Sequence, residues 1–154
     1  MTGTRAGTRI EGDSTMTRRI LFLCTGNSAR SQMAEAILRR LGGDRFEVHS
    51  AGTEPKQAVF APVIEAMKEI GLDISGQQPK GLEPFLGRMH FEKVIIVCNE
   101  AERKCPTIFG SSQRLFWPFD DPAAATGSDE EILAECRRIR NQIIERITNW
   151  LAKQ

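Results

Sequence analysis

Apolar residues gather in short continuous runs separated by polar segments. Two of these runs, RRILFLC and KVIIVC, each end in a cysteine and are long enough for a buried strand. RFEVHSAG has the alternation of a strand that enters a turn, and RLFW is a shorter apolar run. The pattern therefore predicts four strands, over residues 18–24, 45–52, 93–98 and 114–117.

Between and after these runs the apolar positions recur at helical spacing. This spacing predicts helices over residues 29–42, 61–71 and 128–150. The first ends at Gly42 and Gly43, and the second starts near Pro62 and ends at Gly71, as helix-terminating glycines and first-turn prolines favour. The last helix carries one long apolar stripe, formed by Ile132, Cys136, Ile139, Ile143, Ile147 and Trp150.

Strands that alternate with helices favour parallel pairing with right-handed crossovers. The expected fold is an α/β domain with a single doubly wound, four-stranded parallel sheet in the order 2-1-3-4 and helices on both faces. In such a sheet, ligands bind outside the carboxyl ends of the strands at the switch point. We expect residues 18–154 to form this domain and the Gly-, Thr- and Arg-containing residues 1–17 to be a disordered tail.

Composition narrows the class of protein. A chain of 154 residues with 40% apolar content suits one domain, expected to be a monomer. The formal charge of +1 gives no basic stripe for nucleic acid. No run approaches the roughly 18 apolar residues of a membrane span, and the N-terminus lacks the apolar core of a secretory signal, so we expect a cytoplasmic protein without a membrane partner.

In a reducing compartment cysteines are typically catalytic, redox-active or simply buried. The chain has Cys24, Cys98, Cys105 and Cys136, without the paired CxxC spacing of a structural zinc site. Cys136 lies on the apolar stripe of the last helix and is expected in the core. Cys24 and Cys98 each follow a predicted strand, at the edge of the sheet where ligands bind.

Five residues separate Cys24 from Arg30, so the chain turns tightly from strand to helix. The backbone N–H groups of this loop, the helix dipole and the Arg30 guanidinium would form a cradle for a tetrahedral oxyanion above the Cys24 sulfur. The same field should favour the thiolate, with the Ser31 hydroxyl as a further donor. The predicted oxyanion-binding loop is Thr25, Gly26, Asn27, Ser28, Ala29, Arg30 and Ser31. The spacing alone also fits a buried structural cysteine followed by an ordinary helix cap.

Four motifs occur together and in order: CTGNSARSQMAE, SAGTEP, VIIVCNEAERKCP and WPFDDPA. With them the chain resembles the thioredoxin-coupled arsenate reductases of the low-molecular-weight protein tyrosine phosphatase superfamily, from about Arg18 to the C-terminus. The resemblance implies that arsenate is the substrate, with phosphate and sulfate as competing oxyanions. It also implies thioredoxin as the reducing partner, without a cofactor.

The resemblance also assigns roles to individual residues. Cys24 would displace hydroxide from arsenate with Asp121 as the general acid, and Arg30 would hold the oxyanion. Cys98 would then attack the Cys24 sulfur and release arsenite. Cys105 would attack Cys98 and leave a disulfide for thioredoxin.

Two other functions fit the same residues. A phosphatase for phosphotyrosine or small phosphoesters would need neither Cys98 nor Cys105, but the chain has no tyrosine and places three alanines after Pro122, where such phosphatases carry aromatic residues. A non-enzymatic arsenite or zinc sensor would use the cysteines as ligands. Some relatives hold potassium with a carboxylate at the position of Lys80. The other residues of that site match Asn27, Glu35 and Ser50. Lys80 either supplies its own ammonium there or is a solvated loop lysine, and no metal is expected.

Overall fold

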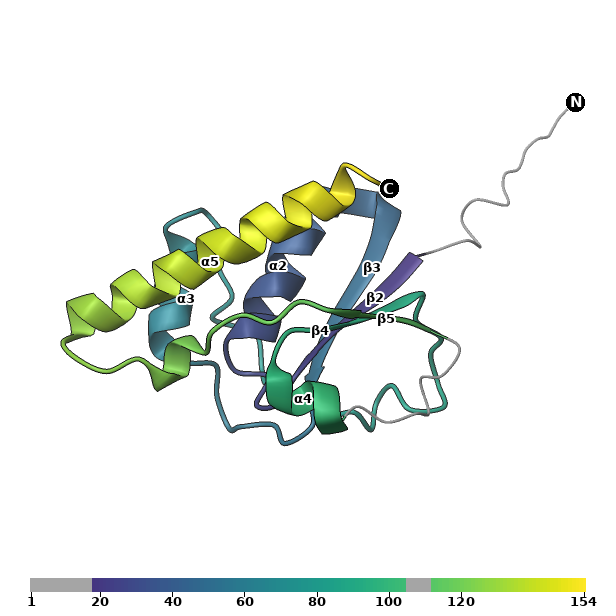
Figure 1. Cartoon of the computed structure of the whole chain (residues 1–154), viewed down its shortest axis with the longest axis horizontal. Coiled ribbons are helices and arrows are strands. Elements are labelled where there is room, and N and C mark those ends of the chain that lie inside the picture. The colour runs from purple at the N-terminus through teal and green to yellow at the C-terminus, as the bar shows by residue number, and fades with distance from the viewer. Residues whose placement is uncertain (1–17, 105–111) are drawn as a thin grey trace, which may run out of the picture.

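The structure is a computed structural model that describes residues 18–104 and 112–154. The predicted tail, residues 1–17, and the expected relay residue Cys105 both lie outside the described residues. Within the described part the chain forms one α/β layer structure (Figure 1).

The sheet has the predicted topology. All neighbouring strands pair in parallel, and their spatial order is β3-β2-β4-β5, which is the predicted 2-1-3-4 order. Each strand lies within one or two residues of the range expected from its apolar run. The strands are β2 (Arg18–Cys24), β3 (Phe46–Gly52), β4 (Lys93–Ile96) and β5 (Gln113–Phe116).

The three predicted helices are present, together with a short fourth helix that directly follows Cys98. The last helix begins with a capping box, in which the Ser128 hydroxyl accepts from the Glu131 N–H and the Glu131 carboxylate accepts from the Ser128 N–H. The helices are α2 (Arg30–Gly42), α3 (Ala61–Lys68), α4 (Asn99–Lys104) and α5 (Asp129–Leu151), with single 3₁₀ turns over Gly43–Arg45 and Pro122–Ala124.

Both faces of the sheet are covered. Successive residues of β2 point to opposite faces, and the side chains of residues 20–23 are all fully buried. On the face of the sheet to which the Val48 side chain points, helix α2 packs against β3. The Arg39 guanidinium of α2 donates to the Val48 carbonyl over 2.7 Å. On the other face, the His49 ring contacts Phe85 and Phe91, which come from the segment between α3 and β4.

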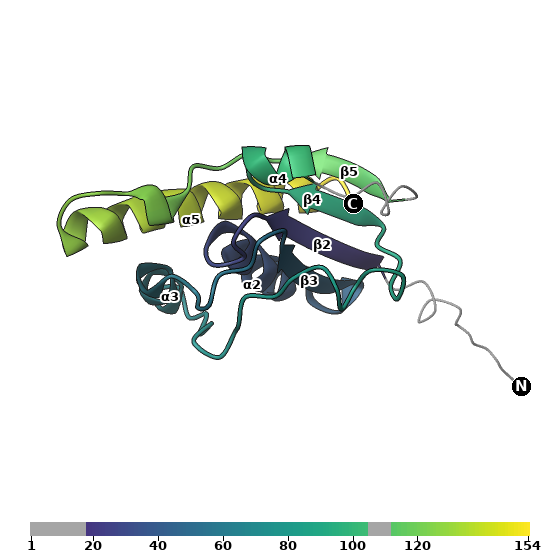
Figure 2. The ribbon, with the colours of Figure 1, turned by 90° about the horizontal axis from the view of Figure 1, so that it is seen from below.

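The long helix α5 contacts two of the other helices, α2 and α3. It packs across α2 and α3, as the two perpendicular views show (Figures 1 and 2). Glu69, which follows α3, receives hydrogen bonds from Arg137 and Arg140 of α5. These bonds lower the pKa of Glu69 to about 2. The contact fixes α5 relative to α3.

The carboxyl ends of the neighbouring strands β3, β2 and β4 meet at one end of the sheet. Strand β2 ends at Cys24, β3 ends at Gly52, and β4 is followed by Val97 and Cys98. A Cβ atom on Gly52 would lie 2.5 Å from the Thr25 carbonyl oxygen, so this position requires glycine for the loop after β2 to pass over the end of β3. None of the helices in residues 18–104 and 112–154 combines the length and apolar character needed to cross a membrane.

Candidate active site

A hollow of ≈ 330 Å³ opens where the strand ends converge. It brings together Cys24, Arg30, Cys98 and Asp121, which the sequence analysis predicted as site residues. Its lining residues are Cys24, Thr25, Gly26, Ser28, Ala29, Arg30, Lys56, Cys98, Asn99, Glu100 and Asp121. The oxyanion-binding loop therefore forms one wall, and the residues after β4 form another.

The Cys24 sulfur is held by two polar contacts at the base of this loop. The Asn27 backbone N–H donates to the sulfur over 3.1 Å, and the Ser31 hydroxyl lies 2.8 Å from it. Asn27 has φ of +50°, a left-handed conformation that is rare outside glycine. This backbone geometry turns its N–H toward the sulfur side of the loop.

The expectation that the loop lowers the pKa of Cys24 is wrong. Cys24 is 2% exposed, and burial raises the pKa of its thiol above the ordinary value. The Ser31 hydroxyl, the Asn27 N–H and the Arg30 charge oppose this effect but do not overcome it. The prediction relied on several N–H donors acting together, whereas among the described residues one backbone N–H donates to the sulfur.

Arg30 and Asp121 face each other across the hollow. Arg30 Nη2 lies 3.6 Å from Asp121 Oδ2, and Arg30 Nη1 donates to the Phe119 carbonyl over 3.0 Å. Asp121 also accepts from the Ala123 N–H over 2.9 Å, which orients its carboxylate. Arg30 Nε is buried and has no hydrogen-bond partner in the described part of the chain. It is a donor that an oxyanion could use.

Cys98 lies beside the loop rather than in register with Cys24. Strand β2 pairs with β4 so that Leu23 is opposite Ile96, which confirms that the two strands are neighbours. The Thr25 hydroxyl lies 3.3 Å from the Cys98 sulfur and donates to Glu100 over 3.3 Å. A single loop hydroxyl thus connects the wall of the Cys24 cradle with the second thiol.

The remaining cysteines differ in position. Cys136 of α5 is fully buried in the core, as expected, and burial raises its pKa to about 11. Cys24, Cys98 and Cys136 are all free thiols. Cys105 lies beyond the described end of α4, so its expected role is not tested by the structure.

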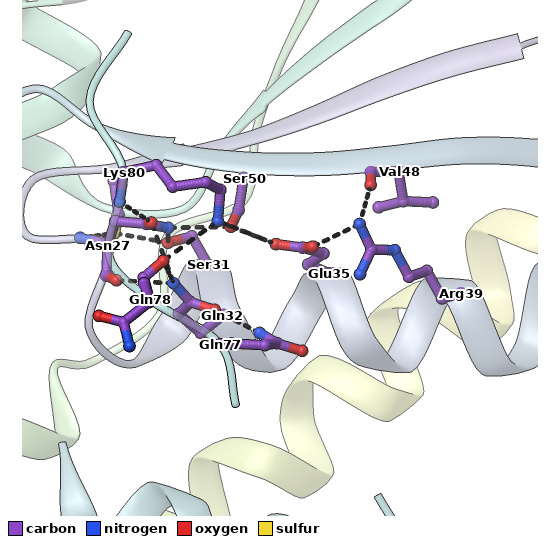
Figure 3. Close-up of polar contacts among 11 residues, drawn as sticks. Asn27, Ser31, Gln32, Glu35, Arg39, Val48, Ser50, Gln77, Gln78 and Lys80 are labelled. Carbon is purple, nitrogen blue, oxygen red and sulfur yellow. Dashed lines mark hydrogen bonds and ion pairs between the residues drawn. The ribbon is translucent and has the colours of Figure 1, made fainter. Parts of the chain in front are cut away.

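A buried polar cluster supports the loop from behind (Figure 3). The Asn27 side chain is its centre: Nδ2 donates to Ser31 over 2.7 Å and to Ser50 over 3.0 Å, and Oδ1 accepts from the Lys80 backbone N–H over 2.8 Å. Gln32 Nε2 donates to both the carbonyl and the side-chain oxygen of Asn27. These bonds hold Asn27 in its unusual backbone conformation.

The cluster fixes the direction of its hydrogen bonds. The Glu35 carboxylate accepts the Ser50 hydroxyl hydrogen, so the Ser50 oxygen is left to accept from Asn27. The other hydrogen of the Asn27 amide goes to the Ser31 oxygen. The Ser31 hydroxyl hydrogen then remains for the Cys24 sulfur. A buried carboxylate away from the hollow therefore orients a donor toward the nucleophile.

Two cations balance the charge of Glu35, which is 3% exposed. Arg39 Nη2 lies 2.6 Å and Lys80 Nζ lies 3.7 Å from its carboxylate oxygens. Lys80 Nζ also donates to Ser50 over 3.4 Å. Lys80 thus lies where the sequence analysis expected its ammonium. In the described part of the chain no group of three or more His, Cys, Asp or Glu residues is arranged to hold a metal ion.

The residues of the site that the sequence analysis missed include Gln32, Arg39 and Lys56. Arg39 follows Glu35 by four residues on one helix, a spacing that places the two side chains side by side and could have indicated the pair. Gln32 and Lys56 reach the loop only through the tertiary fold, and no local pattern in the sequence indicates them.

The chain belongs to the low molecular weight phosphotyrosine protein phosphatase family, whose sequence profile matches residues 19–154. The expected likeness to arsenate reductases is confirmed by relatives within that family. An arsenate reductase of Halalkalibacterium halodurans is 44% identical over 131 residues, which cover 85% of this chain and 93% of the relative.

Solved structures agree with this assignment. "An arsenate reductase in the phosphate binding state" is 32% identical and superposes with a TM-score of 0.73, over 89% of this chain and 98% of that chain. A thioredoxin-dependent arsenate reductase of Corynebacterium glutamicum is 28% identical with a TM-score of 0.59, over 86% of this chain and 62% of that chain.

Proposed function

We propose that this protein is an arsenate reductase that uses Cys24, Cys98 and Cys105 as a thiol relay regenerated by thioredoxin. The observation that carries the proposal is the meeting of two free thiols at one hollow: Cys24 and Cys98 both line it, together with Arg30 and Asp121. A phosphatase needs one of these thiols, whereas a reductase needs both. The arsenate reductases among the relatives support this choice.

In the first step, arsenate lies in the loop against the N–H groups and the Arg30 guanidinium. The Cys24 sulfur bonds to arsenic, and one As–O bond breaks. Because burial keeps Cys24 as a thiol, its proton must leave during the attack. Asp121 lines the same hollow and transfers one proton from the sulfur to the departing oxygen, which leaves as water.

In the second step, the Cys98 sulfur attacks the Cys24 sulfur. The S–As bond breaks and its electron pair stays on arsenic, which is reduced from the +5 to the +3 state and leaves as arsenite. The two thiols are oxidised to one disulfide and so supply the two electrons. The Cys98 proton ends on arsenite, with the Thr25 hydroxyl next to the Cys98 sulfur as its first acceptor.

In the third step, Cys105 attacks Cys98 and frees Cys24. Helix α4 occupies residues 99–104, and a helical rise of about 1.5 Å per residue would place the Cα atoms of residues 98 and 105 about 10 Å apart. A disulfide needs a Cα separation of roughly 4.4–6.8 Å. If Cys105 continues this helix, forming the disulfide requires α4 to unwind, which would expose the bond to thioredoxin.

The same observations support a small-phosphoester phosphatase as a side activity. The family is one of phosphotyrosine phosphatases, and one of the similar solved structures is an arsenate reductase in the phosphate binding state. Asp121 is followed by Pro122 and three alanines rather than by aromatic residues, so an aryl group would find little to pack against. We also propose that the protein is a monomer and that it works in the cytoplasm, a reducing compartment in which its free thiols stay reduced.

The test is arsenate-dependent NADPH oxidation with thioredoxin and thioredoxin reductase, compared between the wild type and Cys105→Ser. The variant should release one arsenite per chain and then stop, with Cys24 and Cys98 trapped as a disulfide that intact-mass measurement detects. Cys136→Ala, which removes the core thiol, should turn over. Sustained turnover of Cys105→Ser with thioredoxin would refute the relay, and p-nitrophenyl phosphate hydrolysis far faster than arsenate reduction would favour the phosphatase.

A further inference from the structure

Lys56 occupies a fixed place next to the oxyanion-binding loop. The segment after β3 runs alongside that loop, and backbone hydrogen bonds of 2.8–3.1 Å join the two. The Lys56 N–H itself donates to the Gly26 carbonyl over 2.9 Å. The donors on the β3 side are Thr53, Glu54, Lys56 and Phe60, and the acceptors are Cys24, Thr25, Gly26 and Ser28. The backbone of Lys56 is thus held in place relative to the cradle.

The Lys56 side chain packs along the loop. A Cβ atom added to Gly26 would lie 3.1 Å from Lys56 Cγ and 3.2 Å from Lys56 Cε. The absence of a side chain at Gly26 therefore leaves the space that the Lys56 stem fills. Lys56 also lines the hollow and is exposed, so its side chain borders the mouth while its stem packs along the loop.

Lys56 differs from the other charged residues of the hollow in having no partner. Arg30 and Asp121 pair with each other, and Glu100 accepts from the Thr25 hydroxyl. Among the described residues none forms an ion pair or side-chain hydrogen bond with Lys56, which is exposed. An unpaired ammonium beside a site for an anion gains favourable electrostatic energy when the anion enters, because it gives up no other ion pair.

We propose that Lys56 is a second oxyanion-binding residue, which attracts and holds a doubly charged tetrahedral anion at the mouth of the hollow before Arg30 and the loop enclose it. The identity of that anion as arsenate rests on the proposed function; binding of inorganic phosphate does not. Lys56 touches the outer oxygens rather than the bond that breaks, so its contribution is to binding and not to the chemical step.

Because the Lys56 ammonium is exposed, salt should screen its contribution to the binding of the anion. Replacing Lys56 by Gln should weaken phosphate binding by roughly three- to tenfold at low ionic strength, and by less at high ionic strength, as for other exposed charge pairs. The KM for arsenate should rise by a similar factor while kcat stays within about twofold, the pattern of lost ground-state binding.

The experiment measures inorganic phosphate binding by calorimetry, and arsenate kinetics with thioredoxin, for the full chain at two ionic strengths. Lys56→Gln is compared with Lys56→Arg, which keeps the charge, and with Lys153→Gln, which removes one positive charge beside the C-terminus. There Gln154 contacts Arg18 at the start of β2, at the opposite edge of the sheet. Lys56→Arg and Lys153→Gln should bind phosphate like the wild type.

Unchanged phosphate binding in Lys56→Gln would overturn the proposal, as would an equal loss in Lys153→Gln or a fall in kcat at constant KM. The two proposals fail separately. A wild type that binds phosphate through Lys56 but does not reduce arsenate refutes the reductase function alone. If the wild type reduces arsenate normally but Lys56→Gln binds phosphate as tightly as the wild type, only the proposed role of Lys56 is refuted.

Discussion

The Cys24 sulfur lies 2.8 Å from the Ser31 hydroxyl oxygen, and the hydrogen-bond directions of the buried cluster leave the Ser31 hydrogen for that sulfur. This bond lowers the pKa of Cys24 against the larger effect of burial. Because the sulfur is buried, the hydroxyl is a donor that solvent cannot readily replace.

Ser31→Ala should therefore raise the pKa of Cys24 further. A hydrogen bond to a charged group is worth about 1.5–3 kcal/mol, so alkylation of Cys24 by iodoacetamide at fixed pH should slow by roughly tenfold or more. The pH profile of alkylation, read from the mass of the Cys24 peptide, gives the measurement. Urea unfolding checks that the variant is folded. An unchanged profile would mean that Ser31 does not donate to the sulfur.

Asp121 and Asp120 are adjacent in sequence but face different partners. Asp121 lies 3.6 Å from Arg30 in the hollow, whereas Asp120 is exposed and pairs with Arg138 over 3.0 Å. Loss of a general acid typically costs about 10²- to 10⁴-fold in rate. Asp121→Asn should lower kcat for arsenate within that range, and Asp120→Asn should have a small effect, as exposed ion pairs contribute little. Equal losses in both variants would contradict the assignment of the acid.

Lys80 places its ammonium against the Glu35 carboxylate and the Ser50 hydroxyl. Because the chain supplies this cation itself, arsenate reduction by the wild type should proceed at the same rate in sodium and potassium salts of equal ionic strength. Lys80→Met leaves the 3% exposed Glu35 with Arg39 as its neutralising partner and should lower the free energy of unfolding by about 1 kcal/mol. Stimulation of the wild type by potassium would show that the ammonium does not fill this role.

Glu69 connects α3 to α5 through Arg137 and Arg140, and these bonds lower its pKa from 4.5 to about 2. A carboxyl whose pKa is lower in the folded state stabilises the fold above its unfolded pKa, and that contribution disappears as the pH falls through the folded pKa. Glu69→Gln should therefore be less stable than the wild type at pH 6, and the difference should shrink between about pH 4.5 and pH 2.

Urea unfolding of both proteins across this pH range provides the measurement. Glu145→Gln, which removes a carboxylate of α5 that does not contact Glu69, serves as the control. A difference between Glu69→Gln and the wild type that stays constant down to pH 2 would mean that the carboxylate charge does not contribute.

The sequence by itself determined the strands, three of the helices and the sheet order. A short continuous apolar run such as residues 20–24 favours a strand buried on both faces, and the alternation of such runs with helical stripes favours parallel pairing. It also determined the tight loop from Cys24 to Arg30, because that loop is one local segment between a strand and a helix. The likeness to arsenate reductases came from four motifs in order.

The tertiary structure decided what surrounds the sulfur. The pKa of Cys24 depends on how many donors reach it and how deeply it is buried, and neither quantity is local in sequence. Likewise, Lys56 meets Gly26, and Lys80 meets Glu35, only because strand ends and loops far apart in the chain converge at one edge of the sheet. Burial and long-range contact are properties of the packed chain, so the residue pattern could locate the site but could not set its electrostatics.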